Sequence, residues 1–304
     1  MRVLREVAVR GSFSAAAEAL SFTQSAISQQ IAALGREAGC TLVQRNARGI
    51  RLTEAGEALV RHTDAILARL NEAEAELEAI AGVRGGRLRL SSFESAAATL
   101  MPLAIAAFRA EHPGVELSLV INEPEDAFPL LRSGELDLAL GYDSRIRGTT
   151  DGIARYHLIS DPMFLAMPPD HPLAHKRNLR LADLADEAWI AGATDCECNR
   201  LMNRACAVAG FEPRVEFQTD DYAAMQGFVA AGVGVSLIAE LGLTTIRDDI
   251  VVRSLGRETP VREVYAATAA DAHRTPATQA MLDILHSVAD RYEKRRPQLQ
   301  LVAG

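Results

Sequence analysis

Short polar side chains gather on one side of a helix that is expected to begin after Thr23. Apolar residues at positions 26, 27, 31 and 34 form the other side at helical spacing. The outward side carries two hydroxyls and three amides: Gln24, Ser25, Ser28, Gln29 and Gln30. Such groups hydrogen-bond base edges and phosphates in the major groove of DNA, and glutamine can pair with adenine through two bonds. The alternative is a solvated polar face, so the interpretation depends on what positions this helix.

A second short helix is expected just before it. Ser12 is placed to cap a helix whose apolar face includes Phe13, Ala16 and Ala17, and Thr23 is placed to cap the next helix. Ser21 lies at the tight turn between them, where glycine is usual and serine is tolerated. Two short helices joined by three or four residues predict a helix-turn-helix. The polar face lies on its second helix, the one that enters the groove in such motifs.

Residues 42–53 predict a short hairpin with a turn at 46–49. Arg45, Arg48 and Arg51 of this wing are expected to contact phosphates, the alternative being exposed arginines with no such role. Residues 1–61 hold eight arginines and five acidic residues, a net charge of +3. Because the whole chain carries −8, the remainder carries −11. This asymmetry favours phosphate binding by the N-terminal region alone.

A long helix is expected from residue 54 to 81, because the segment has no proline and its only glycine, Gly56, lies in the first turn. Apolar or small residues recur in two seven-residue registers: Leu59, Ile66, Ala73 and Ile80, with Thr63, Leu70 and Leu77. This pattern is typical of a coiled coil and predicts a homodimer, or a dimer of dimers, on an interrupted palindrome in double-stranded DNA. The alternative is an amphipathic helix packed on its own domain. Residues 82–86 are rich in glycine and predict a hinge.

Short apolar strands alternate with helical segments through the rest of the chain. Strands are expected near 88–90, 115–121, 136–140, 163–167, 189–190, 215–218 and 233–238, and helices near 97–110, 198–209 and 221–231. Repeated strand–helix–strand units indicate an α/β fold with parallel strands.

Residues 11–17, 23–31 and 51–56 together closely resemble the DNA-binding domain of LysR-type transcriptional regulators. Residues 134–140 and 230–236 resemble recurring segments of that family's effector domain, which has a periplasmic-binding-protein-like fold of two α/β subdomains. The resemblance implies an α+β multidomain protein with a winged helix-turn-helix at 1–53, a linker helix at 54–81, a hinge at 82–86 and an effector domain at 87–304. Subdomain I would comprise about 87–160 and 265–293, and subdomain II about 161–264. A regulator modulated by a small molecule bound between the subdomains is the implied function.

The resemblance also implies two sets of site residues. The DNA-facing set is Ser12, Thr23, Gln24, Ser25, Ser28, Gln29, Arg45, Arg48 and Arg51. The effector set lies at expected strand ends, where α/β folds bind ligands: Ser91, Ser92, Ser95, Asn122, Glu123, Gly141, Tyr142, Ala193, Thr194 and Thr219. Each of the latter could instead be a capping or turn residue. Glu94 and Glu123 disfavour a strongly anionic effector.

Four cysteines are too few and too uneven for a disulfide scaffold, so free thiols are expected. Cys196, Cys198 and Cys206 lie in the region where peroxide-sensing relatives in the family keep their reactive cysteines. A thiol-based redox sensor of the same fold is therefore an alternative, set against ordinary thiols near the cleft. His171 and His175 could join two of these cysteines at a metal, although no metal or other cofactor is expected.

Other function classes find little support. The sequence contains no Gly-x-Ser-x-Gly, His-Glu-x-x-His or Walker A motif, and Gly232-Val233-Gly234 lacks the third glycine of a dinucleotide site. An enzyme is therefore not expected. Charged residues near the N-terminus interrupt any signal peptide, and no apolar run reaches about 18 residues. A cytoplasmic protein is predicted, which also argues against a solute-binding protein.

Overall fold

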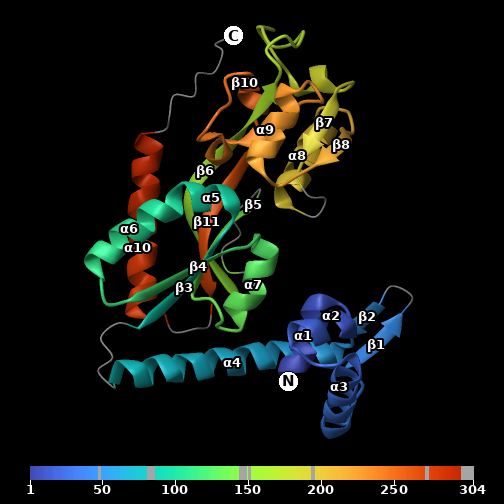
Figure 1. Cartoon of the computed structure of the whole chain (residues 1–304), viewed down its shortest axis with the longest axis vertical. Coiled ribbons are helices and arrows are strands. Elements are labelled where there is room, and N and C mark those ends of the chain that lie inside the picture. Colours follow the sequence, from blue (N-terminus) through green and yellow to red (C-terminus); the bar gives the residue numbers. More distant parts are fainter. Residues whose placement is uncertain are drawn as a thin grey trace.

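A computed structural model of the chain describes residues 1–46, 49–80, 86–143, 149, 152–192, 196–270 and 274–295. A small helical region with a hairpin is followed by one long helix and a large α/β body (Figure 1). The N-terminal elements are α1 (Arg2–Arg10), α2 (Phe13–Ala19), α3 (Gln24–Ala38), β1 (Val43–Asn46), β2 (Gly49–Leu52) and α4 (Glu54–Ile80). The predicted winged helix-turn-helix is confirmed.

The two predicted helix caps are present. Ser12 Oγ accepts a hydrogen bond from the Ala15 N–H at 3.1 Å, and Thr23 Oγ1 accepts one from the Ala26 N–H at 3.2 Å. Each cap satisfies one of the backbone donors that a helix leaves free in its first turn. Ser21 has a φ of 56°, the only positive φ among the described non-glycine residues. The turn between α2 and α3 therefore needs the left-handed conformation that glycine adopts most easily.

A compact apolar cluster fixes the orientation of α3. Leu4 of α1, Phe13 and Ala16 of α2, and Ile27 and Ile31 of α3 are all buried in it. The hairpin closes the cluster from the side, with β1 and β2 antiparallel and Val43 opposite Leu52. Because the buried face of α3 is held by this packing, its polar face is directed to solvent.

The predicted a/d positions of α4 have two different environments. Leu59 packs against the N-terminal cluster, and Thr63 is buried, with Oγ1 donating to the Leu59 carbonyl at 2.7 Å. Ile66 and Leu70 are instead 46% and 55% exposed, and Ala73 is exposed too. The side chains of Leu77 and Ile80 lie outside the described residues. The middle of α4 thus presents an apolar stripe that nothing in this chain covers among the described residues.

The body is a mixed α/β structure. Its strands are β3 (Arg87–Ser92), β4 (Glu116–Ile121), β5 (Leu138–Asp143), β6 (Ile153–Met167), β7 (Ala188–Ala191), β8 (Arg214–Gln218), β9 (Ser236–Ala239), β10 (Val251–Arg253) and β11 (Val261–Ala269). Its α-helices are α5 (Glu94–Ala98), α6 (Leu100–Glu111), α7 (Pro124–Arg132), α8 (Glu197–Val208), α9 (Tyr222–Ala230) and α10 (Pro276–Lys294). Short 3-10 helices span Leu181–Leu184, Glu240–Leu243 and Gly256–Glu258.

Seven strands form one sheet in the order β10-β6-β11-β5-β3-β4, with β9 also paired to β6. The pairs β3–β4, β3–β5 and β7–β8 are parallel, as predicted. The pairs that involve β6 are antiparallel, and so is β11–β5, so the expectation of parallel strands holds only in part. β6 and β11 run through both halves of the body and join two groups of buried residues, one around Leu90, Phe108 and Leu285 and one around Met163, Trp189 and Leu237.

No described helix combines the length and the apolar character that crossing a membrane would require.

Gly56 lies where α4 passes the wing most closely. A Cβ at this position would lie 2.1 Å from the backbone oxygen of Leu42, which also accepts the Thr53 N–H at 3.0 Å. Backbone cannot move aside as a flexible side chain can. We therefore expect Gly56→Ala to destabilise the protein by about 1–3 kcal/mol or more through overpacking.

Gly227 provides a matched control, since it is also helical but a Cβ there would meet nothing within 4 Å. Gly227→Ala should be neutral or stabilising by up to about 1 kcal/mol, the helix preference of alanine over glycine. Thermal unfolding followed by circular dichroism compares the two variants. Equal midpoints for both would show that the Gly56 contact relaxes without cost.

Candidate functional site

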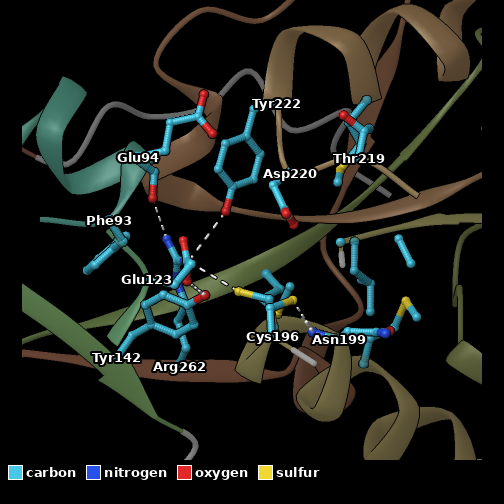
Figure 2. A pocket seen from close by; sticks show the side chains of 18 residues that line it. Phe93, Glu94, Glu123, Tyr142, Cys196, Asn199, Thr219, Asp220, Tyr222 and Arg262 are labelled. Atoms are coloured by element: carbon cyan, nitrogen blue, oxygen red, sulfur yellow. Dashed lines mark hydrogen bonds between the residues drawn. The ribbon is translucent and has the colours of Figure 1, made fainter. Parts of the chain in front are cut away.

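A pocket opens between the two halves of the body (Figure 2). One wall carries Phe93, Glu123 and Tyr142, which follow or belong to β3, β4 and β5. The opposite wall carries Asp220 and Tyr222 from the start of α9. The pocket therefore draws its lining from segments far apart in sequence that the two crossing strands hold together.

Arg262 of β11 lies at the base of this pocket and is 1% exposed. Its Nε and Nη2 each lie 2.8 Å from Oδ2 of Asp161, which lies directly opposite on β6. Nη2 also donates to Ser95 Oγ at 2.7 Å, and the guanidinium stacks 5.0 Å from Phe93 and 4.7 Å from Tyr142, measured to the ring centres. These contacts neutralise and orient the cation, so it contributes no uncompensated positive charge to the pocket.

The remaining charged groups at the pocket are acidic. Burial raises the pKa of Glu123, and a hydrogen bond from the Tyr142 hydroxyl at 2.5 Å partly opposes that rise. Burial and the nearby carboxylates of Asp221, Asp220 and Glu123 also raise the pKa of Glu94. Mutual repulsion of carboxylates across the pocket makes it a poor place for a further negative charge.

The structure brings some of the predicted effector residues to the pocket and not others. Ser95, Glu123, Tyr142 and Thr219 line it. Ser91 and Ser92 are fully buried within β3 and do not, since the strand continues two residues beyond the predicted end. Gly141 is not part of the lining and packs against Tyr265 instead. A Cβ at Gly141 would lie 2.8 Å from Cε2 of the Tyr265 ring. Asn122 precedes the lining residue Glu123 but is not itself part of the lining, while Ala193 and Thr194 lie outside the described residues.

Sequence reasoning missed several lining residues, of which Arg262 is the most important. Its contact with Ser95 spans 167 positions along the chain, and no local pattern marks it. Phe93, Asp220 and Tyr222 were also missed, although Phe93 and Asp220 each lie next to a predicted residue and Tyr222 lies three residues after Thr219. Counting outward from strand ends finds the right loops but not which of their side chains turn inward.

The cysteines of the described residues are free thiols. Cys196 caps α8 with its Sγ accepting from the Asn199 N–H at 3.3 Å, and burial raises its pKa to about 12. Burial likewise raises the pKa of Cys206 to about 12 and raises that of Cys198, despite an Arg262 N–H 3.2 Å from the Cys198 sulfur. Cys196 and Cys198 line the pocket, but raised pKa values oppose the thiolate that redox sensing needs.

The possible metal ligands have other partners. His171 Nδ1 accepts from the Leu173 N–H at 3.2 Å, and its Nε2 lies 3.4 Å from Glu187. Within the described parts of the chain, no three histidine, cysteine or acidic side chains are grouped so that they could hold a metal ion.

Several predicted DNA-facing residues are accessible to solvent in the N-terminal region. Gln24, Ser25 and Gln29 of α3 are exposed and Ser28 is half-buried. Thr23 Oγ1 lies 3.0 Å from Ser25 Oγ, which links the cap to the polar face. Arg51 is exposed on β2. Arg48 and the side chain of Arg45 lie outside the described residues.

Comparison with known proteins decides the family. Residues 1–57 match the family described as a bacterial regulatory helix-turn-helix protein of the lysR family, and residues 81–290 match the LysR substrate binding domain. The chain belongs to the LysR family. It is 30% identical over 293 residues to the probable HTH-type transcriptional regulator LrrA of Synechococcus elongatus, covering 95% of this chain and 96% of that protein. Members of this family are transcriptional regulators rather than enzymes.

Solved structures of LysR-family proteins share the fold. A Corynebacterium glutamicum OxyR C206 mutant aligns over 99% of this chain and 93% of its own, with a TM-score of 0.64 and 20% identity. Full-length CbnR in complex with its target DNA aligns over 94% of this chain and 99% of its own, with a TM-score of 0.57 and 22% identity.

The raised pKa of Glu123 predicts a pH-dependent effect of Glu123→Gln. Because the pKa is higher in the folded than in the unfolded protein, the ionised side chain lowers stability above it, and acidification restores that stability. Glutamine can still accept from Tyr142 but carries no charge. We expect the variant to melt a few degrees above the wild type at neutral pH, with the gap closing as the pH falls toward the ordinary glutamate value of 4.5.

Melting temperatures of the two proteins, measured in parallel across this range, test the expectation. Glu116→Gln on the exposed side of β4 is the control and should show no such trend. A Glu123→Gln variant that is less stable than wild type at neutral pH would contradict it.

Proposed function

We propose that this LysR-family regulator binds an interrupted palindrome as a homodimer and changes its DNA-bound conformation when a small molecule enters the pocket between its two subdomains. The observation that carries the proposal is the presence, in one chain, of an outward polar helix in a winged helix-turn-helix and a pocket between two α/β halves. In this proposal residues 1–53 bind DNA, 54–81 form the dimer and 87–304 bind the effector, in the cytoplasm.

The DNA-binding half rests on α3. Its buried face is held by Ile27 and Ile31, so Gln24, Ser25 and Gln29 are available to base edges. The structural similarity to CbnR, which was solved with its target DNA, supports the same use of this domain. Arg51 on β2 is available to a phosphate beside the groove.

The homodimer rests on α4. Ile66, Leu70 and Ala73 lie on its exposed surface at heptad spacing, and apolar side chains so arranged are covered when two such helices pack together. Two copies held in this way would present two α3 helices to two half-sites of an operator.

The effector is proposed to be a small neutral or positively charged molecule. Glu94, Glu123 and Asp220 lie at the pocket, whereas the cation of Arg262 is already paired with Asp161. An anionic effector would have to overcome carboxylate repulsion, and the described lining residues include no cation other than the paired Arg262 to offset it. Tyr142 and Tyr222 offer ring surfaces to an apolar or ammonium-bearing group.

DNase footprinting on the DNA upstream of the protein's own gene tests the DNA-binding half. We expect two protected half-sites separated by about one helical turn or a multiple of it, as two-fold symmetric binding requires. Absence of protection at protein concentrations well above those of specific binding would overturn the proposed function.

Matched pairs of small amines and carboxylates on the same carbon skeleton test the effector class. Amines that bind should raise the melting temperature progressively as their concentration increases, and the corresponding carboxylates should not. Stabilisation by carboxylates alone would overturn the proposed charge preference. Ser95→Ala, which removes the hydroxyl that Arg262 contacts, should weaken the response and leave DNA binding intact.

A further inference from the structure

One arginine of the N-terminal region reaches into the effector domain. Arg5 of α1 is 8% exposed, although it carries a full charge. Its Nη2 donates to Ser133 Oγ at 2.7 Å and to the Pro129 carbonyl at 3.1 Å, and its Nη1 pairs with Glu135. These acceptors all lie in or just after the last turn of α7, where a helix attracts a cation.

The same guanidinium is also paired with the linker helix α4. Arg5 Nε lies 2.9 Å from Oδ1 of Asp64 on α4, and both side chains are almost completely buried. Arg5 therefore joins α1 and α4 to α7, which lies at the lower end of the body, next to these two helices (Figure 1).

The other end of α7 borders the pocket. Glu123, its N-cap residue, lines the pocket and accepts the Tyr142 hydrogen bond. Two residues further on, Glu125 forms an ion pair with Arg200 of α8, which belongs to the opposite half of the body. A helix of nine residues, about 13 Å long, thus contacts both walls of the pocket at one end and Arg5 at the other.

We propose that α7 transmits effector occupancy of the pocket to the DNA-binding domain through Arg5. The inference rests on the proposed function, since it assumes that the pocket binds an effector and that α3 binds DNA. A ligand that displaces Glu123 or draws α8 toward α7 shifts the helix as a unit, because the helix is short and the packing of its buried Ala127 and Leu131 resists local deformation. Its last turn then moves relative to α1.

The contact between Arg5 and α7 can break without leaving Arg5 unpaired. When α7 leaves, Arg5 keeps Asp64 as its partner, so no buried charge is left unpaired. The Glu135 side chain is already 51% exposed and can turn to water. Two arrangements of one arginine, with and without α7, give the two states that a coupled regulator needs.

Coupling is reciprocal, so DNA must alter α7 if α7 alters DNA binding. Hydrogen exchange of the full-length protein, with and without a duplex from the protein's own footprinted upstream region, measures this. We expect the exchange rate of amides in and just after α7 to change by about fivefold or more when the duplex is saturating. The double variant Ser133→Ala/Glu135→Gln should lose that change and still bind the duplex, because Arg5 and Asp64 are untouched. Glu116→Gln is the matched control and should behave as the wild type.

The outcomes separate two failures. A wild type that binds the duplex with no change at α7, or a double variant that keeps the change, overturns the relay and leaves the DNA-binding function standing. A wild type that protects no upstream site in footprinting overturns the proposed function itself, and the relay with it.

Discussion

Asp161→Ala should be among the most destabilising substitutions in this protein, at a cost of about 3–5 kcal/mol. Asp161 is 0% exposed and is the counter-ion of the equally buried Arg262. Its other oxygen accepts the Leu241 N–H at 3.1 Å. Removing the carboxylate therefore leaves a buried cation and a backbone donor unsatisfied at the point where the two crossing strands meet.

Chemical denaturation followed by Trp189 fluorescence measures this loss. Trp189 is the only tryptophan of the chain and is fully buried, so its emission reports directly on the packed state. Asp249→Ala is the control, since Asp249 also pairs with an arginine, Arg247, but in an exposed site where such pairs contribute little. Similar denaturation midpoints for the two variants would show that the buried pair is not needed to join the two halves.

Gln29→Ala and Ser28→Ala should each weaken specific DNA binding by about 5- to 150-fold, the value of one good base contact. Gln29 is exposed and Ser28 half-buried on α3, and neither belongs to the apolar cluster that holds the helix. Melting temperatures and non-specific affinity should therefore stay close to those of the wild type, because phosphate contacts carry most non-specific binding.

Gln218→Ala on β8 is the matched control for this series, since it removes an exposed glutamine of the effector domain. Titration of each variant against the footprinted duplex and a scrambled one gives the ratio of specific to non-specific affinity. Variants of Ser28 and Gln29 that keep the wild-type ratio would show that α3 does not read the bases.

The N-terminal region could be predicted almost completely from the sequence. The caps at Ser12 and Thr23, the turn at Ser21 and the wing are set by neighbouring residues, and local patterns reveal such features. The long strands were harder. β6 passes through both halves of the body, and only its last five residues, which are buried without a break, were predicted, while burial along its first ten residues is irregular. β11 and α10 were not predicted as elements.

The pocket was predicted in its location but only in part in its residues. Ser95, Glu123, Tyr142 and Thr219 were predicted from their positions near expected strand ends. In an α/β sheet the carboxyl ends of parallel strands lie at one edge, where ligands bind. Arg262 depends on the pairing of β11 with β6, which is a long-range contact without a local signature. The packing of Arg5 against α7 is likewise invisible in sequence, since it joins residues 124 to 130 positions apart.

Fluorescence anisotropy of the purified full-length protein on a duplex from its own upstream region, beside a scrambled duplex and over a series of salt concentrations, tests the central claim most directly. We predict preference for the upstream duplex and an affinity that falls steeply as salt rises, since arginine–phosphate contacts release counter-ions. Equal affinity for both duplexes at every salt concentration would contradict a sequence-specific regulator.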